Sequence, residues 1–174
     1  MRLSHVPGNS TRPITDRVKE ALFNIIGADI IGANFLDLFG GSGSVGIEAL
    51  SRGAAFARLI DNNQDAYKTI KANLIQTRLE NKAEVILTDT FSYLRRQADK
   101  TFDYIYVAPP QYKNLWKKTL TELESNPSWL EKDAWVIVQI DPKEYENTIW
   151  KTISEFDQRR YGSTLLIFFE RTSS

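Results

Sequence analysis

The sequence predicts a single α/β domain with a doubly wound, mostly parallel sheet of seven strands that ends in an antiparallel hairpin. Short apolar segments alternate with amphipathic helical segments, which is the pattern of parallel strands joined by helices. A glycine turn follows the first predicted strand, and the last two are joined tightly at Gly162-Ser163, as in a hairpin. The 174 residues, 42% of them hydrophobic, suit one domain with a sizeable core.

The first elements follow from capping signals and apolar spacing. Residues 1–10 are expected to form a short polar arm, and residues 11–174 the single domain. Thr15 or Asp16 is the expected N-cap of a helix that continues to Gly27. The apolar positions of this helix share one face: Val18, Ala21, Leu22, Ile25 and Ile26.

The remaining elements are predicted in the same way. Strands are expected at residues 35–39, 56–61, 83–88, 102–107, 134–140, 156–161 and 164–170. Helices are expected at residues 44–52, 63–79, 91–97, 115–123 and 143–153. Gly53 ends the second helix as its C′ residue. The helix at 63–79 is expected to face the sheet with Ala66, Ile70, Leu74 and Ile75.

Residues 34–53, which read NFLDLFGGSGSVGIEALSRG, carry the most specific chemical signal. A strand, a glycine turn and a helix in this order form the nucleotide-binding end of a Rossmann-like unit. Glycine is needed there because the turn requires backbone angles that a Cβ forbids, and because a ligand must approach the backbone closely. A tight turn without a ligand is the alternative. The turn residues predicted to bind a cofactor are Phe39, Gly40, Gly41, Ser42 and Gly43.

Acidic side chains accompany the first three strands and favour a bound ligand. Asp37 lies inside the first strand, a placement that is unusual for nicotinamide enzymes and usual for S-adenosylmethionine enzymes, where the acid helps to hold the cationic methionine end. Asp61, followed by Asn62, lies about twenty residues past the loop, where an acid that binds ribose hydroxyls is expected. Asp89 and Thr90 follow the third strand, where an acid can accept a hydrogen bond from an adenine amino group. Asp89 is equally suited to be a helix N-cap, and both roles can hold at once.

The fourth strand ends in a rigid, proline-containing loop. Two prolines fix an extended backbone and leave carbonyl oxygens without a local donor, so the loop can direct them at a substrate amino group. An aromatic residue just beyond can stack on a flat base. The alternative is a rigid loop in which Tyr112 caps the core. The predicted catalytic loop is Ala108, Pro109, Pro110, Gln111 and Tyr112.

Composition excludes several other functions. The chain has no cysteine, which excludes disulfides, thiolate nucleophiles and cysteine zinc sites, and its single histidine, His5, lies in the polar arm. No metal is expected. The formal net charge is zero, so a polyanion must be held by a local patch. No apolar run approaches the length of a membrane span, and the start of the chain lacks a signal-peptide pattern, so we expect a cytoplasmic protein without membrane association.

Two motifs together resemble the RsmD-like 16S rRNA guanine-N2 methyltransferases. Residues 11–25 read TRPITDRVKEALFNI and are similar to the N-terminal signature of that family, and residues 35–43 with 46–54 are similar to its cofactor motif. The resemblance implies the class I methyltransferase fold, S-adenosyl-L-methionine as cofactor, and a guanine of small-subunit rRNA as substrate. It also implies a monomer that acts on the small ribosomal subunit or its assembly intermediate rather than on free RNA.

The chain departs from the family pattern on the substrate side. The family carries an acid before Pro-Pro-aromatic, whereas here Ala108 takes the acidic position and Gln111 is inserted before Tyr112. The basic N-terminal arm of the family is also shortened, with Arg2 as the only certain cation before residue 11. The resemblance implies that the missing acid accepts hydrogen bonds from the reacting amino group. Loss of such an acceptor costs roughly 3 kcal/mol, or about a hundredfold in rate.

Three interpretations of Ala108 are open. In the first, which we favour, the carbonyl oxygens of Ala108 and Pro109, with the Gln111 amide, suffice as acceptors for the amino group. In the second, a carboxylate from elsewhere enters the site. In the third, the chain binds its ligands and methylates slowly or not at all. Two alternative functions also remain open: a non-catalytic ribosome-assembly factor, and an amine methyltransferase that acts on another substrate. A nicotinamide oxidoreductase is disfavoured, because the Tyr67/Lys71 pair follows the second strand, far from where such a pair acts.

RNA contacts are predicted from cations near the presumed active-site mouth. Cations around an aromatic side chain suit phosphate and base contacts. The alternative is an ordinary solvated helix face with Trp116 packed inward. The candidate RNA-binding residues are Arg12, Arg17, Lys113, Trp116 and Lys117.

Overall fold

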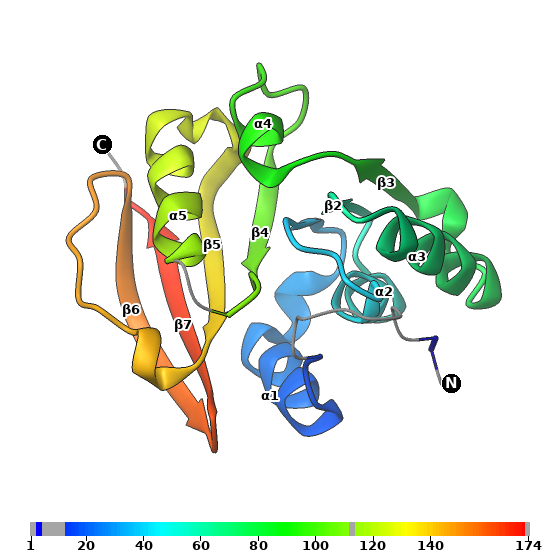
Figure 1. Ribbon diagram of the computed structural model, residues 1–174, viewed down its shortest axis with the longest axis horizontal. Helices are drawn as coiled ribbons and strands as arrows, with labels where there is room; N and C mark the ends of the chain where they lie inside the picture. The colour runs from blue at the N-terminus through cyan, green and yellow to red at the C-terminus, as the bar shows by residue number, and fades with distance from the viewer. Residues whose placement is uncertain (1–2, 5–12, 112–113, 173–174) are drawn as a thin grey trace.

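The computed structural model describes residues 3–4, 13–111 and 114–172, and its centre is a seven-stranded sheet in the order β3-β2-β1-β4-β5-β7-β6 (Figure 1). Strands β1 to β5 run parallel, whereas β7 is antiparallel to both β5 and β6. This arrangement confirms the predicted fold class. The strands are β1 Asn34–Asp37, β2 Phe56–Asp61, β3 Ala83–Leu87, β4 Phe102–Val107, β5 Leu130–Ile140, β6 Ile153–Tyr161 and β7 Thr164–Arg171.

The sheet divides the core into two layers, and helices cover each of its faces. One buried cluster joins α1, α2 and α3 to the sheet, and a second joins α4 and α5 to the opposite face. Short 3-10 turns lie at Gly27–Ile30, Glu80–Lys82, Pro127–Trp129 and Pro142–Glu144. The helices are α1 Asp16–Ile26, α2 Ser44–Ser51, α3 Gln64–Gln76, α4 Thr90–Leu94 and α5 Leu115–Ser125. Within the described part of the chain, no helix combines the length and apolar character needed to cross a membrane.

The strand order places the switch point of the sheet between β1 and β4. After β1 the chain moves outward through β2 and β3, and then it returns to add β4 and β5 on the other side of β1. In open sheets of this kind, a crevice forms beyond the carboxyl ends of the two central strands, where the following loops turn to opposite faces. The fold therefore brings the loops after β1 and β4 to one place.

Local capping signals predict several helix boundaries correctly. Thr15 is the N-cap of α1 and accepts a hydrogen bond from Val18 N at 3.2 Å. Asn63 caps α3 in the same way, accepting from Ala66 N at 3.0 Å. Gly53, two residues past α2, has φ of 112°, which a residue with a Cβ rarely adopts. These signals are readable because they depend on residues a few positions apart.

Two predictions about helices are wrong. The helix predicted at 143–153 is absent: only the turn Pro142–Glu144 forms, and no helix follows before β6. The reason is a long-range contact, since the Glu124 carboxylate of α5 accepts hydrogen bonds from the backbone N of Lys151 and Thr152, both at 2.7 Å, and holds the chain out of a helix. Ile75, predicted to face the sheet, is 63% exposed near the end of α3.

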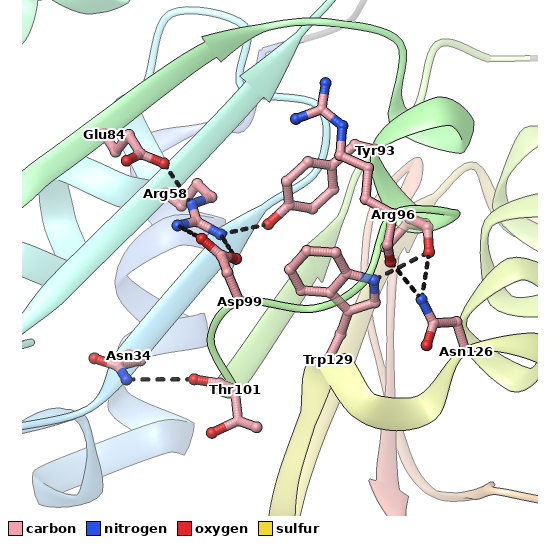
Figure 2. A network of polar contacts seen from close by, with 10 residues as sticks. Asn34, Arg58, Glu84, Tyr93, Arg96, Asp99, Thr101, Asn126 and Trp129 are labelled. Atoms are coloured by element: carbon pink, nitrogen blue, oxygen red, sulfur yellow. Dashed lines mark hydrogen bonds and ion pairs between the residues drawn. The ribbon is translucent and has the colours of Figure 1, made fainter.

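A buried arginine links β2 to β3 and to the segment after α4 (Figure 2). The Arg58 side chain is 5% exposed and forms ion pairs with Glu84 and Asp99, both at 2.8 Å. It also donates a hydrogen bond to the Tyr93 hydroxyl at 2.9 Å. The Tyr93 ring stacks on Trp129, with 4.5 Å between ring centroids. One charged side chain thus organises contacts among four separate segments.

We expect Arg58→Met to lower the free energy of unfolding by about 1–3 kcal/mol, because the buried Tyr93 hydroxyl loses its donor. Glu84 and Asp99 are partly exposed, so their carboxylates can be solvated when the guanidinium is removed. Urea unfolding at neutral pH measures the change. The control is Arg95→Met, which removes an exposed arginine paired with Glu122 and should have little effect. Equal stability of the two variants would contradict this role of Arg58.

Candidate functional site

The glycine loop after β1 connects this strand to α2 and is held by backbone hydrogen bonds, both within the loop and to β2. Gly40 N donates to Ile60 O of β2 at 2.7 Å, and Gly43 N donates to Gly40 O at 2.8 Å. Gly41 and Gly43 have φ of 59° and 84°, in the left-handed region that favours glycine. The turn therefore has the conformation that its glycines predicted.

A buried asparagine, which the sequence analysis missed, supports this loop from α3. Asn73 is fully buried, and its Nδ2 donates to Ser42 O at 2.8 Å and to Ser4 O at 3.1 Å. Asn73 Oδ1 in turn accepts from Ser4 N at 3.0 Å. The available signal was a polar residue at helical spacing from Ala66 and Ile70, on the face that packs against the sheet.

The Asp61 carboxylate lies against the same loop from β2. Its Oδ2 accepts from Gly41 N at 2.9 Å, and its Oδ1 accepts from Asn63 N at 2.9 Å. Asp61 is half-buried, and the following Asn62 is exposed. Two residues twenty positions apart in the sequence, both predicted to bind a cofactor, are therefore in direct contact.

Asp37 lies at the end of β1, directly before the loop, and it is only 1% exposed. Its Oδ1 accepts a hydrogen bond from Phe39 N at 3.2 Å, and among the described residues it has no ion-pair partner. Burial raises the pKa of Asp37 to about 7, the Phe39 hydrogen bond opposes this rise, and the nearby Asp61 carboxylate adds to it. A buried acid without a cation is an unusual arrangement that a positively charged ligand would stabilise.

The segment after β3 starts α4 and contacts the end of β1. Asp89 is the N-cap of α4 and accepts from Ser92 N at 2.9 Å, so its capping role is confirmed, and the residue remains exposed. Thr90, predicted to bind cofactor, is 5% exposed and donates its hydroxyl to Leu38 O. Thr90 therefore joins α4 to Leu38, the first residue after β1, and its hydroxyl proton is used within the protein.

The loop after β4 borders a pocket at the ends of three strands. Ala108 is half-buried and Pro109 is buried, and both line this pocket together with Gln111. The remaining lining residues come from the end of β5 and from the turn into β7: Gln139, Ile140, Asp141, Ser163 and Thr164. Of the predicted catalytic loop, Pro110 is half-buried and Tyr112 lies outside the described residues. No local sequence signal indicates that the end of β5 lies beside this loop.

A buried tyrosine connects this pocket to the region of Asp37. The Tyr106 hydroxyl of β4 donates a hydrogen bond to Gln139 Oε1 of β5. Burial raises the pKa of Tyr106 well above its ordinary value, and the charge of Asp37 adds to the rise. Tyr106 is therefore a neutral donor, which fixes the orientation of the Gln139 amide.

The predicted RNA-binding residues have different surroundings. Trp116 is 1% exposed and stacks on Tyr145, so the prediction that it contacts RNA is wrong and the alternative of inward packing is confirmed. Arg17 lies exposed, with its guanidinium 5.9 Å from the centre of the Tyr161 ring. Lys117 forms an ion pair with Glu146 at 2.7 Å. Arg12 and Lys113 lie outside the described residues.

The sheet order, the glycine loop between β1 and α2, and the terminal hairpin define the class I methyltransferase fold. The chain matches the family described as Conserved hypothetical protein 95 over residues 1–170, and it belongs to that family. This finding, together with the relatives below, confirms the resemblance to RsmD-like methyltransferases.

The relatives are similar over most of the chain. The Ribosomal RNA small subunit methyltransferase D of Buchnera aphidicola subsp. Acyrthosiphon pisum is 35% identical over 133 residues, which cover 76% of this chain and 69% of that protein. The protein of the same name from Escherichia coli K12 is 38% identical over 74% of this chain and 63% of its own length. A solved structure described as a putative methyltransferase, yhhF, from Escherichia coli has a TM-score of 0.86 at 31% identity and covers 97% of this chain and 90% of its own.

We expect Asp37→Asn to stabilise the ligand-free protein at high pH. The folded-state pKa, about 7, lies above the ordinary value of 3.8. The folded protein therefore favours the protonated carboxyl. The stability that this preference supports is fully present below about pH 4, and it is lost as the pH rises through about 7. Asparagine stays neutral and keeps an acceptor for Phe39 N, so at pH 8 the variant should gain up to about 4 kcal/mol in unfolding free energy.

Urea unfolding of both proteins at pH 4.5 and pH 8 measures this gain, which should be small at the lower pH. Asp65→Asn, on the exposed first turn of α3, is the control and should show no comparable pH dependence. An Asp37→Asn variant that is less stable at pH 8 than the natural protein would contradict the predicted cost of ionising Asp37.

Proposed function

We propose that this protein is an S-adenosylmethionine-dependent methyltransferase that modifies the exocyclic N2 amine of a guanine in small-subunit rRNA. The observation that carries the proposal is the glycine loop in contact with Asp61 and directly following the buried Asp37. Membership in a family with relatives named Ribosomal RNA small subunit methyltransferase D supports the substrate class.

The residues of the loop fit this cofactor. A Cβ added to Gly41 would meet no heavy atom within 4 Å, so the loop presents an open face to a ligand. The buried Asp37 carboxylate suits the cationic methionine end, and the Asp61 carboxylate suits the ribose hydroxyls. When bound, S-adenosylmethionine supplies a methyl group on positively charged sulfur. The chain has to hold the acceptor amine in line with that methyl group and exclude water.

The loop after β4 is the part of the chain that we assign to the acceptor amine. Pro109 and Pro110 fix the backbone, so the carbonyl oxygens of this loop keep one direction as the substrate enters. Hydrogen bonds accepted from the amine stabilise the positive charge that develops on its nitrogen during transfer. The buried Pro109 and half-buried Ala108 give these acceptors a partly desolvated setting.

We assign the RNA contacts to cations around this edge of the sheet. Arg17 is exposed on α1, and Lys117 and Lys118 of α5 line a hollow between α4 and α5 that also includes Arg95. Because the formal net charge is zero, these local charges are what would attract phosphate. We place the protein in the cytoplasm, as a monomer that acts on the assembled small subunit or its assembly intermediate.

We expect Gly41→Asn to weaken the affinity for S-adenosylhomocysteine by at least about tenfold, because the new side chain occupies the open face of the loop. Asparagine tolerates the left-handed φ, so the fold should survive. Gly32→Asn is the matched control: Gly32 has φ of 79°, a Cβ added to it also meets no atom within 4 Å, and it lies before β1, at the end of that strand opposite to the loop. Calorimetry compares the two variants, and equal affinities would contradict the assignment of the loop.

Transfer of a labelled methyl group tests the proposed activity directly. The substrate is small subunits from an Escherichia coli strain that lacks its Ribosomal RNA small subunit methyltransferase D. We expect label in the rRNA, located at guanine N2 after digestion to nucleosides, and none when subunits from the parent strain are used. Binding of S-adenosylhomocysteine without any methyl transfer to subunits would instead favour a non-catalytic assembly factor. We consider this alternative because position 108 lacks the acid of the family motif.

A further inference from the structure

The proposed reaction needs a hydrogen-bond acceptor for the substrate amine, and the side chain of Ala108 cannot supply one. The pocket that Ala108 lines contains one carboxylate, that of Asp141. Asp141 follows β5 directly, whereas the predicted catalytic loop follows β4. The structure therefore brings an acid from outside the loop to the pocket that Ala108 lines.

The register of the sheet explains why these residues line one pocket. β4 and β5 are parallel, with Tyr106 beside Ile137 and Val107 beside Val138. Continued by one step, the same register sets Ala108 beside Gln139. Ala108 and Asp141 directly follow β4 and β5, and within these strands Tyr106 and Gln139 have their side chains on the same face, because side chains alternate along a strand. This is the face of the sheet covered by α1, α2 and α3.

The two polar side chains at the end of β5, Gln139 and Asp141, differ in the hydrogen bonds that their oxygen atoms already accept. Gln139 Oε1 already accepts the hydrogen bond from the Tyr106 hydroxyl. Asp141 Oδ1 accepts from Lys143 N at 2.9 Å, a bond that orients the carboxylate at the start of the turn Pro142–Glu144. Oδ2 accepts no hydrogen bond from residues 3–4, 13–111 or 114–172, so it is a charged acceptor that a substrate amine can use.

We propose that Asp141 is a catalytic residue that accepts a hydrogen bond from the substrate amino group and so replaces the acid absent at Ala108. This inference rests on the proposed function and specifies how the chain carries it out. The carbonyl oxygens of Ala108 and Pro109 then contribute to the same site without acting alone. The backbone bond from Lys143 fixes the carboxylate as the rigid proline loop fixes those carbonyls.

The step balances without any further reactant. The amine lone pair forms a bond to the methyl carbon, the carbon–sulfur bond breaks, and its electron pair remains on sulfur. The nitrogen gains positive charge, which the hydrogen bond to Asp141 stabilises. The surplus proton on nitrogen passes to the Asp141 carboxylate and from there to water, which restores the ionised side chain.

Asp141→Asn tests the proposal, because asparagine keeps an oxygen for Lys143 N and removes the charge. We expect methyl transfer to unmethylated small subunits to fall by about a hundredfold. Introducing the acid at the other position, in the double variant Asp141→Asn with Ala108→Asp, should restore most of the rate. The matched control is Asp133→Asn, an exposed residue with φ of 62° at the opposite end of β5, which should transfer at the natural rate.

Two binding measurements separate a catalytic role from a structural one. Calorimetry should give Asp141→Asn the natural affinity for S-adenosylhomocysteine. Filter binding of unmethylated small subunits, with S-adenosylhomocysteine present, should give this variant weaker binding than Asp133→Asn. Loss of affinity for S-adenosylhomocysteine, or an activity loss that Ala108→Asp does not restore, would show that Asp141 acts through the fold and would overturn the proposal.

The outcomes also distinguish this inference from the proposed function. If the natural protein transfers methyl groups and Asp141→Asn transfers them equally fast, the role of Asp141 is overturned while the proposed function stands. If neither the natural protein nor Ala108→Asp transfers methyl groups to the subunits, the proposed function is overturned, and the role of Asp141 with it.

Discussion

The bracing of the glycine loop after β1 is the constraint on which the rest of the site depends. The loop is bonded to β2 through Gly40 N and Ile60 O, to the Asp61 carboxylate through Gly41 N, and to Asn73 of α3 through Ser42 O. A loop of small residues would otherwise sample many conformations, because glycine restricts the backbone least. Three anchors from two elements give one conformation, with the open face of Gly41 left for a ligand.

The buried Asp37 carboxylate shows how stability and function oppose each other here. Asp37 is almost fully covered, and the hydrogen bond from Phe39 N is too little to offset its burial, so its pKa rises to about 7. Folding would favour a neutral residue at this position. A carboxylate that lacks a cation in the ligand-free protein is a site prepared for a cationic ligand, because binding supplies the missing charge.

The substrate side is organised by the neighbouring strands β4 and β5. The proline loop provides rigid carbonyl oxygens, and the end of β5 provides the Gln139 amide and the Asp141 carboxylate around the same pocket. The buried Tyr106 hydroxyl links Gln139 to the region of Asp37. A change at one strand end, from an acid to Ala108, can therefore be offset at the next strand end, because the parallel register holds the two together.

The sequence by itself determined the features that depend on nearby residues. Alternating apolar segments gave the strands, and β2 and β4 begin and end where predicted. Thr15 capped α1, and the glycine turn formed with left-handed angles at Gly41 and Gly43. These features follow from backbone sterics and from hydrogen bonds between residues a few positions apart, so the local sequence is enough to predict them.

Only the tertiary structure decided the features that depend on distant contacts. The segment after Pro142–Glu144 has good local spacing for a helix, but Glu124 of α5 binds its backbone and prevents one. Trp116 carries the same local signal whether it faces solvent or the core, and the packing of α5 buried it. The placement of Ala108 and Asp141 around one pocket depends on the register of β4 against β5, which is fixed by the packing of the whole sheet and cannot be read from either strand alone.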